Sequence, residues 1–506
     1  MPHKWHPSAT RTLLAATLGF CLTAPAAPAA APDWARLAPL PAAKPRDIPP
    51  GPFAPNWDSL TDRYRVPDWF VDGKFGIFIH WGLYAVPAYH NEWYAKHMYG
   101  TLARWHAAHY GPPDKFGYKD FIPMFKAEKY NPAEWAALFH RAGARYVVPV
   151  AEHHDGFAMY DSALTRWCAG KMGPKRDLIG ELATAVRHEG LVFGLSSHRM
   201  EHHTFMYPSA GVKSDLFDPA FKDFYGPPVP GQMNDGDASP EFQEDWLARC
   251  QELVDKYRPQ MVYFDNGVND RAYDDVKLRF AAYYYNQAAA WGADVTLATK
   301  GAAFLAGTIP DFEKAAREPG DTMAGVWQVD DQIGNSWGYV SDMRYRSSEA
   351  ILKELITAVS RNGNLLLNVS PKADGTIPVE QRAILTEIGR WLGVNGEAIY
   401  ATHPWIKSLD GKFAFTVREE TLYAIGVGSP GTEASIESLS TKAKIEGKVA
   451  SVTILGDTSP VTFTQEESGL KLKLPPNPAR PDPIVLKITG LKMNHPYERK
   501  PAHANT

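Results

Sequence analysis

The residues of this sequence that are best suited to chemistry lie at the ends of short apolar runs. The sequence EHHD at residues 152–155 follows the run YVVPV at residues 146–150, which is typical of a parallel strand buried on both faces. KFGIFIHWG at residues 74–82 ends similarly in a His-Trp pair, and MVYF at residues 261–264 is followed by Asp265. Barrel enzymes hold their catalytic groups at the C-terminal ends of buried parallel strands. These clusters therefore favour an enzyme.

Each cluster also has a purely structural interpretation. A single histidine after a strand often forms structural hydrogen bonds, and an aspartate there often caps the next helix. His153 and His154 would point to opposite faces of an extended strand, which makes them poor joint ligands for a metal. No cysteine lies near them and the sequence has no His-Glu-x-x-His motif, so we expect no metal site. The convergence of three polar strand ends favours chemistry over structure.

Strand-like and helix-like segments alternate through the middle of the chain. The predicted helices are 132–144, 177–189, 241–257, 278–291, 348–362 and 379–395, and the predicted strands are 69–82, 146–150, 191–196, 261–265, 295–299, 322–328 and 364–370. This alternation predicts an α/β fold, and residues 57–404 have the length of a (β/α)8-like (TIM) barrel. Residues 405–495 contain short alternating runs separated by Gly, Pro, Ser and Asp, which indicate an all-β sandwich. Residues 496–506 form a tail.

The N-terminus indicates export. Lys4 and Arg11 precede an apolar segment at residues 13–22 and Ala- and Pro-rich sequence, so residues 1–31 have the pattern of a signal peptide. The apolar segment is too short to span a bilayer, and no later stretch is long enough. We expect a secreted protein, periplasmic or extracellular, in which residues 32–56 form a linker or approach segment.

The composition is that of a globular protein large enough for two domains, with 506 residues, 44% hydrophobic and 22% charged. Removal of residues 1–31 would change the net charge from −4 to −6, because it takes two basic residues and no acidic one. An acidic chain has no electrostatic case for binding nucleic acid. Cys168 and Cys250 would remain, which allows one disulfide without requiring it.

Six stretches together resemble the signature sequences of the family 29 α-L-fucosidases. They are KFGIFIHWGLYAVPAYHNEWY (74–94), HHDGFAMYDSALTRW (153–167), GPKRDLIGEL (173–182), YRPQMVYFD (257–265), SWGYV (336–340) and NLLLNVSPKADGTIP (364–378). They occur in family order, and the family also carries a C-terminal β-sandwich after its barrel. The resemblance implies retaining hydrolysis of a terminal α-L-fucoside, in which one carboxylate attacks the anomeric carbon and another group acts as acid and base.

The resemblance also assigns roles to residues. Asp265 matches the family nucleophile. His80, His153 and His154 match histidines that bind fucose hydroxyls, and Glu92 and Trp93 match a pair that binds a hydroxyl and packs on the sugar. Trp81, Tyr94 or Trp327 would supply an apolar patch for the fucose methyl group.

The acid/base departs from the family pattern. One branch of the family has the acid in a Trp-Glu pair, and this chain has Gln328 after Trp327; an amide is no useful proton donor. Glu313 is the first choice because it resembles the Asp-x-Glu-Arg segment of other members, and Arg317 is the candidate for its basic neighbour. The rivals are Glu318, Asp330 and Asp331.

A second departure follows the predicted strand at residues 191–196. Many relatives carry Tyr-Tyr-Ser there, and this chain has SSHRMEH at residues 196–202. We expect His198 and Glu201 near the pocket; the alternative is a salt bridge within the loop.

The sequence therefore predicts a secreted retaining α-L-fucosidase that acts on a fucosylated oligosaccharide or glycoconjugate and needs no cofactor or metal. One alternative is an exo-glycosidase of the same fold that acts on a related sugar, such as a galactoside. Another is a catalytically silent glycan-binding protein. The intact nucleophile motif speaks against the silent protein.

Overall fold

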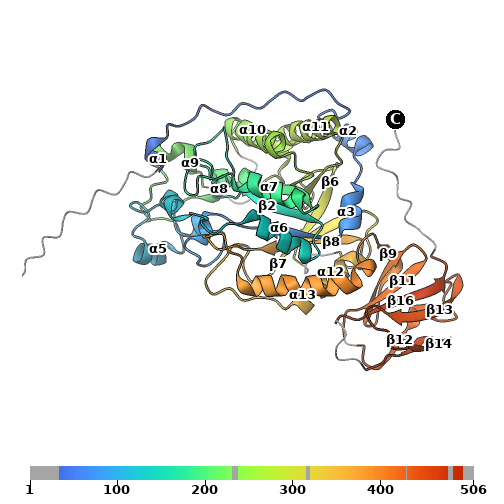
Figure 1. The fold of residues 1–506 in the computed structure, drawn as a ribbon. Coiled ribbons are helices and arrows are strands. Elements are labelled where there is room, and N and C mark those ends of the chain that lie inside the picture. The colour runs from blue at the N-terminus through green and yellow to red at the C-terminus, as the bar shows by residue number, and fades with distance from the viewer. Residues whose placement is uncertain (1–32, 231–237, 315–318, 429, 477–481, 494–506) are drawn as a thin grey trace, which may run out of the picture.

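The computed structural model describes residues 33–230, 238–314, 319–428, 430–476 and 482–493. Its larger part is a closed barrel of eight parallel strands in chain order (Figure 1). The strands are β1 (Phe75–Ile79), β2 (Tyr146–Glu152), β3 (Val192–Ser197), β4 (Met261–Phe264), β5 (Thr296–Lys300), β6 (Thr308–Glu313), β7 (Trp327–Gln332) and β8 (Gly363–Val369). β8 pairs with β1 and closes the ring. The predicted barrel is confirmed; residues 1–31 and 496–506 lie outside the described residues.

Six long helices surround the barrel. They are α6 (Pro132–Arg141), α7 (Leu178–His188), α10 (Pro240–Tyr257), α11 (Asp274–Trp291), α12 (Ser348–Ser360) and α13 (Val379–Asn395). The shorter ones are α1 (Asp33–Arg36), α2 (Trp57–Arg63), α3 (Asp68–Gly73), α4 (Tyr94–His97), α5 (Ala103–His109), α8 (His202–Phe205) and α9 (Lys222–Tyr225). No helix joins β5 to β6, and none joins β6 to β7 in the described part of that connection.

Two predictions of local structure need correction, and one strand was not predicted. Residues 68–73 fold as α3, and Lys74 with φ 57° separates this helix from β1, so the predicted strand at 69–82 was too long. β6 was not predicted, and β7 begins at Trp327 rather than at residue 322.

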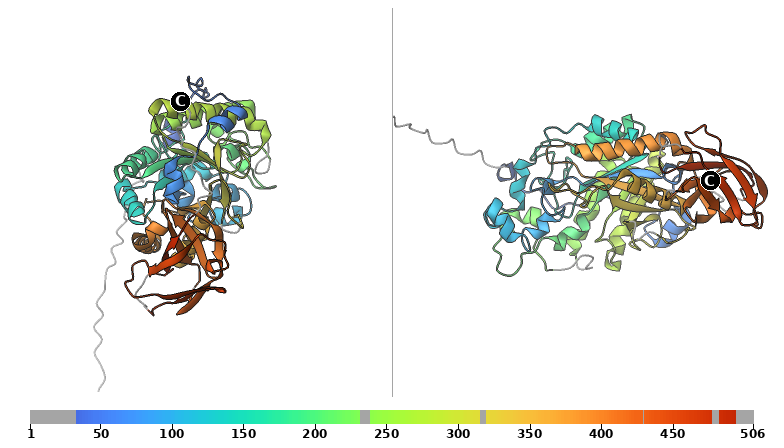
Figure 2. Two further views of the ribbon diagram at one scale, coloured as in Figure 1. Left: turned by 90° about the vertical axis from the view of Figure 1, so that its right-hand side faces the viewer. Right: turned by 90° about the horizontal axis from the view of Figure 1, so that it is seen from below.

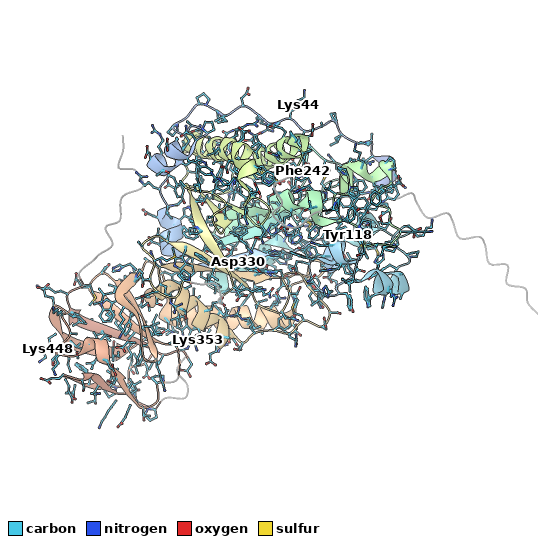
Figure 3. All side chains as sticks on the ribbon, turned by 180° about the vertical axis from the view of Figure 1, so that it is seen from behind. Lys44, Tyr118, Phe242, Asp330, Lys353 and Lys448 are labelled. Carbon is cyan, nitrogen blue, oxygen red and sulfur yellow. The ribbon has the colours of Figure 1, made fainter. Side chains whose placement is uncertain are left out.

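Side chains on the strands alternate between the barrel interior and the surrounding helix layer. The interior cluster holds Phe78, Tyr146, Val148, Met261, Tyr263, Ala298, Ile309 and Leu366. The intervening residues Ile79, Val147, Val262, Phe264, Leu297, Val329 and Leu365 belong to the cluster shared with the helices. This period of two decides which residues at the C-terminal strand ends face the barrel axis. Asp330, labelled in Figure 3, is one of them and is 1% exposed.

Two antiparallel sheets follow and confirm the predicted all-β region. One has the order β13-β16-β11-β10-β9 and the other β12-β15-β14. Their strands are β9 (His403–Asp410), β10 (Phe413–Arg418), β11 (Thr421–Gly426), β12 (Glu433–Ile436), β13 (Gly447–Ile454), β14 (Thr462–Glu466), β15 (Gly469–Lys473) and β16 (Val485–Leu491). The sandwich lies at one end of the barrel (Figure 2). There Trp391 Nε1 of α13 donates to Pro483 O at 2.8 Å.

Within the described part of the chain, no helix is both long and apolar enough to cross a bilayer. Cys168 and Cys250 are buried free thiols, so the disulfide that the sequence allowed is not formed.

Candidate active site

A cavity of about 280 Å³ is lined by residues at the C-terminal ends of the barrel strands. The lining includes His80 after β1, His153 and His154 after β2, His198 after β3, Asp265 after β4, Lys300 and Glu313 at the ends of β5 and β6, and Asp330 in β7. Glu92 and Trp93 line it from the long segment after β1. The structure therefore brings eight of the expected site residues together, whereas Trp81, Tyr94, Trp327 and Glu201 do not line the cavity.

Asp265 continues the inward alternation of β4 beyond Tyr263. Its Oδ1 atom lies 3.0 Å from Lys300 Nζ, and its Oδ2 atom lies 3.4 Å from His154 Nε2 and 3.2 Å from His198 Nδ1. Burial alone would raise the pKa of Asp265, but the charge of Lys300 and the nearby rings of His198 and His154 hold it well below its usual range. The group is thus a carboxylate, as a nucleophile requires.

Lys300, which the sequence analysis missed, lies between several carboxylates. Its Nζ atom is 3.0 Å from Asp265 Oδ1, 2.9 Å from Glu313 Oε2 and 3.5 Å from Asp330 Oδ2. Burial would lower the pKa of Lys300, but these carboxylates raise it well above its usual value. The oxygens of Asp265 and Glu313 that share this ammonium are at most about 6 Å apart, which agrees with the ~5–5.5 Å between the carboxyl groups of retaining glycosidases.

The rivals for the acid role lie in different surroundings. Asp330 is 1% exposed, and it accepts a hydrogen bond from the Tyr263 hydroxyl at 3.1 Å. Burial raises the pKa of Asp330. Asp331 does not line the cavity and pairs with Arg346 at 3.0 Å. Glu318 lies outside the described residues, as does Arg317.

Gln328 takes no part in the cavity lining. Its side chain accepts from the Tyr146 hydroxyl at 2.9 Å and donates to Asp311 Oδ2 at 2.8 Å inside the barrel. The residue that replaces the family's Trp-Glu acid is thus a buried structural bridge.

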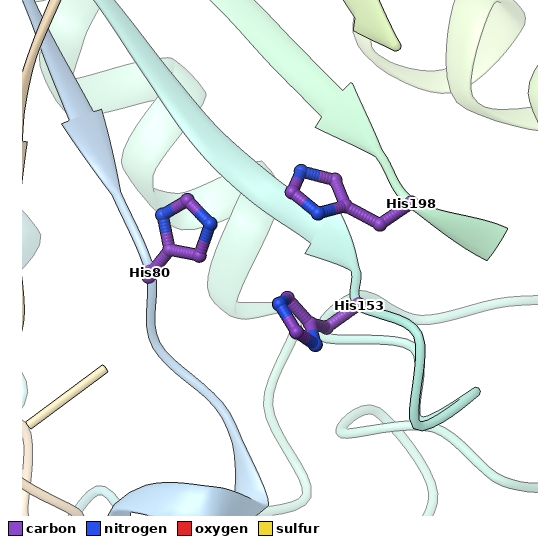
Figure 4. A group of neighbouring side chains, drawn as sticks. All are labelled: His80, His153 and His198. Carbon is purple, nitrogen blue, oxygen red and sulfur yellow. The ribbon is translucent and has the colours of Figure 1, made fainter. Parts of the chain in front are cut away.

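Three histidines that line the cavity, His80, His153 and His198, lie close to one another (Figure 4). Burial lowers the pKa of all three, most strongly for His80 and His153. His80 Nδ1 lies 2.7 Å from Asn368 Oδ1, which fixes the proton on Nδ1 and leaves Nε2 as an acceptor. The described residues offer no hydrogen-bond partner for His153 Nδ1. Such neutral rings suit the donor and acceptor character of sugar hydroxyls.

His154 differs from these rings because two carboxylates face it. Its Nδ1 atom lies 2.9 Å from Glu201 Oε2, and its Nε2 atom lies 3.4 Å from Asp265 Oδ2. Burial would lower the pKa of His154, but Glu201 and Asp265 outweigh it and raise the pKa to about 10. The ring is therefore an imidazolium. Glu201, however, is absent from the residues that line the cavity.

Glu92 and Trp93 line one edge of the cavity. Glu92 Oε2 accepts from the Ser336 hydroxyl and the Trp337 backbone N–H, both at 3.2 Å. Burial raises the pKa of Glu92, and these hydrogen bonds partly offset the shift. The Trp93 ring packs edge to face on His154, with 6.0 Å between the ring centroids.

Two predicted binding residues, Trp81 and Trp327, do not line the cavity. In the alternation of side chains along the strands, both point away from the barrel axis and toward the helices. Trp81 packs on Trp135 and donates to Lys372 O, and Trp327 donates to Arg361 O at 2.9 Å in the helix layer. Tyr94 is also outside the lining and shares a hydrogen bond with His106. Trp337 lines the cavity instead, together with Phe78 and Trp93, and its ring lies 5.1 Å from that of His80.

The sequence carried a signal for the missed residues. Trp337 belongs to the SWGYV stretch at residues 336–340. Lys300 is two residues beyond Ala298, which faces the barrel interior, so the period of two places it inward.

Among the described residues, two groups of side chains have enough ligand atoms close together to be tested as metal sites. His80, His153 and His198 form one, and His154, His198 and Asp265 form the other; within each, one atom per residue lies within 4.8 Å of the others. The second group is unsuitable because the His154 imidazolium has no free lone pair. Neutral imidazoles such as those of the first group are zinc ligands in other proteins, although two-carboxylate glycoside hydrolysis requires no metal.

Comparison with known proteins gives one consistent result. The family model described as Alpha-L-fucosidase matches residues 42–397. The tissue alpha-L-fucosidase of Rattus norvegicus is 30% identical over 479 residues, which cover 87% of this chain and 94% of the rat protein. The plasma alpha-L-fucosidase of Homo sapiens is 32% identical over 446 residues, covering 84% and 88%.

Solved structures give the same result. The Thermotoga maritima alpha-fucosidase in complex with a mechanism-based inhibitor is 31% identical with a TM-score of 0.70, covering 86% of this chain and all (100%) of that chain. The Thermotoga maritima alpha-L-fucosynthase in complex with alpha-L-Fuc-(1-2)-beta-L-Fuc-N3 is 30% identical with a TM-score of 0.72, covering 87% and 100%.

Proposed function

The chain belongs to the α-L-fucosidase family, and from this premise we propose that it releases terminal α-L-fucosyl residues from fucosylated oligosaccharides or glycoconjugates with retention of configuration. The observation that carries the mechanism is the placement of Asp265 and Glu313 on either side of Lys300. The Asp265 Oδ1 and Glu313 Oε2 atoms that share this ammonium lie at most about 6 Å apart. This favours double displacement, because the carboxyl groups of an inverting pair stand about 6.5–9.5 Å apart to admit a water molecule.

In the first step an oxygen of Asp265 attacks the anomeric carbon. Glu313, in its protonated carboxylic-acid form, donates its proton to the glycosidic oxygen as the bond to the aglycone breaks, which gives a covalent fucosyl ester and the free aglycone alcohol. In the second step Glu313, now a carboxylate, takes a proton from water, and the hydroxide attacks the anomeric carbon. The ester bond breaks, fucose leaves, and Asp265 is again a carboxylate next to Lys300.

The remaining cavity residues bind and orient the sugar. We assign the nitrogens of His80, His153 and His198 to hydroxyl recognition rather than to a metal, because neutral rings offer both a donor and an acceptor. Glu92 accepts a further hydroxyl, and Trp93 packs on the sugar ring. Trp337 takes the place of the predicted Trp81 and Trp327 as an apolar surface for the methyl group.

The proposed location is outside the cytoplasm. Residues 1–31 support this because they combine basic residues, a short apolar segment and an Ala-rich end. Mass spectrometry of the protein purified from its native host tests the proposal. A mature chain that lacks residues 1–31 is expected, and an intact N-terminus would contradict it.

Release of nitrophenol from 4-nitrophenyl α-L-fucoside, by wild type and by Asp265→Ala, tests the proposed function. Wild type should turn over, and the variant should lose about 10³-fold or more in kcat because it cannot form the ester. ¹H NMR of the first product should show the α-anomer of fucose. Turnover of a nitrophenyl galactoside in place of the fucoside, or initial release of the β-anomer, would contradict the proposal.

A further inference from the structure

The turn after β3 encloses His154. The His154 Nδ1 atom lies 3.0 Å from the backbone oxygen of His198 and 2.9 Å from Glu201 Oε2. His202 Nδ1 lies 2.8 Å from the backbone oxygen of His154 and so also fixes its main chain. His154 can therefore move little without breaking several contacts with this turn.

These contacts define where the protons of His154 are. Both partners of Nδ1 are acceptors, so Nδ1 carries a proton. Nε2 faces Asp265 Oδ2 at 3.4 Å, and an ionised carboxylate also only accepts. The ring therefore donates from both nitrogens, which requires a positive charge. The other ionisable groups packed on it are the rings of His153 and His198, 4.4 Å and 5.1 Å away between centroids.

Glu201 is itself rigidly placed. It is 2% exposed and ends the 3-10 turn Arg199–Glu201, which begins at an ion pair of Arg199 with Glu152 at 2.6 Å. Gly267, two residues after Asp265, packs directly on it; a Cβ atom at Gly267 would come within 2.7 Å of Glu201 Cγ. Glu201 thus connects the end of β2, the turn after β3 and the segment that carries Asp265.

We propose that Glu201 is a positioning residue that keeps His154 protonated and aims its Nε2–H at Asp265 Oδ2. It touches neither substrate nor reacting atoms, and it acts through His154. The donated hydrogen bond stabilises the Asp265 carboxylate, which leaves the anomeric carbon when the ester is hydrolysed. This inference rests on the proposed function, since it assigns Asp265 as the nucleophile.

A double-mutant cycle with Glu201→Gln and His154→Gln tests the proposal. Each single variant should lower kcat for 4-nitrophenyl α-L-fucoside by about 10- to 100-fold, the effect typical of a partner that orients a functional histidine. If Glu201 acts through His154, the double variant should be about as active as His154→Gln alone. If the kcat of the double variant falls by the product of the two single losses, the proposal is overturned.

Glu252→Gln is the matched control, because Glu252 is a 3% exposed glutamate outside the cavity lining and its loss should leave kcat unchanged.

The pH profile supplies a readout that a merely structural role would not move. With a dinitrophenyl fucoside, whose leaving group needs no acid, kcat/KM of wild type should persist to high pH because His154 stays charged. In Glu201→Gln the alkaline limb should move to lower pH, and Glu201→Asp should restore part of the shift. An unmoved limb would overturn the proposal. Where Glu201→Gln does not fold, Glu201→Asp enters the cycle in its place.

The proposed function and this inference fail in different ways. A wild type that is inert on all aryl fucosides contradicts the function, and the cycle is then measured on the Kd for L-fucose by calorimetry. Coupling between the two positions in that Kd would support the Glu201–His154 link, and simple additivity would overturn it.

Discussion

The cavity has two walls of opposite electrical character. The neutral wall is formed by the buried rings of His80 and His153. The charged wall consists of Asp265, Lys300 and Glu313, at the ends of β4 to β6, together with the His154 imidazolium, whose Nε2 faces Asp265. His153 and His154 make the contrast sharpest, since they are adjacent and 3% and 2% exposed. Burial lowers the pKa of His153, but Glu201 and Asp265 raise that of His154 to about 10. Burial alone therefore does not set the charge of a histidine; its partners do.

A cavity with one neutral wall and one charged wall suits a glycosidase. Sugar hydroxyls are neutral, and neutral rings bind them without the cost of burying a net charge. The anomeric carbon gains positive charge in the transition state, and carboxylates held ready in a dry site stabilise that charge. The following changes test whether chemistry belongs to the charged wall and binding to the neutral one.

Glu313→Ala should have the largest effect and should depend on the leaving group. Loss of the acid should lower kcat/KM by about 10²–10⁴-fold for a fucoside with a poorly acidic leaving group. A dinitrophenyl fucoside should retain nearly normal kcat/KM, because its aglycone leaves without protonation. Steady-state kinetics on both substrates measures the difference.

Asp331→Asn is the control for Glu313→Ala, because Asp331 pairs with Arg346 outside the cavity lining. It should leave the ratio of the two substrates unchanged. An equal loss of Glu313→Ala on both substrates would remove Glu313 from the acid role and direct attention to Asp330.

Lys300→Met should lower kcat/KM by about 10²-fold, comparable to the loss of one charge-stabilising donor in an active site. It should also reshape the acidic limb of the pH profile. In wild type the lowered pKa of Asp265 keeps it ionised in mild acid. Without Lys300, burial raises that pKa, and activity should be lost at a higher pH as the solution is acidified.

Lys314→Met is the matched control for Lys300→Met. Lys314 also lines the cavity, but its side chain is 47% exposed and its Nζ lies 3.8 Å from Glu313 Oε1. The acidic limb of the pH profile of Lys314→Met should coincide with that of wild type. If both variants show the same shift, the effect comes from the net charge of the site and not from the contact with Asp265.

The fold, and much of the lining of the candidate cavity, could be predicted from the sequence because both follow from strand ends. Buried parallel strands bring their C-terminal residues to one mouth, so His80, His153, His198 and Asp265 could be placed there from their positions alone. β6 escaped prediction because TIPDFE contains a proline and no clear apolar run. The salt bridges of Lys300 could not be predicted, since they connect β5 to a side chain that follows β4 and to side chains of β6 and β7, and the sequence does not reveal the relative register of these four strands.

His80→Gln should have a moderate effect that falls mainly on binding. Loss of one neutral hydrogen bond costs about 0.5–1.5 kcal/mol, so KM should rise roughly 2- to 10-fold with a smaller change in kcat.

Because burial lowers the pKa of His80 and His153, wild-type KM should stay constant as the pH falls from about 8 to 5.5. Initial-rate measurements across this range check both expectations. A KM that rises as the pH passes about 6.5 would show that these rings take up protons.

The smallest kinetic effect is expected at Trp327, which the sequence placed in the pocket and the structure places in the helix layer. Trp327→Phe removes the indole N–H that donates to Arg361 O at 2.9 Å and keeps most of the packing. Trp327→Phe should lower the free energy of unfolding by about 1–2 kcal/mol and leave kcat and KM unchanged.

Trp337→Phe is the counterpart of this variant at the cavity, where the Trp337 ring lies 5.1 Å from that of His80. Trp337→Phe should raise KM with little effect on stability. Denaturant unfolding and steady-state kinetics on the pair separate the two positions. A reversed pattern, with KM altered by Trp327→Phe and not by Trp337→Phe, would mean that strand alternation does not decide which tryptophan meets the sugar.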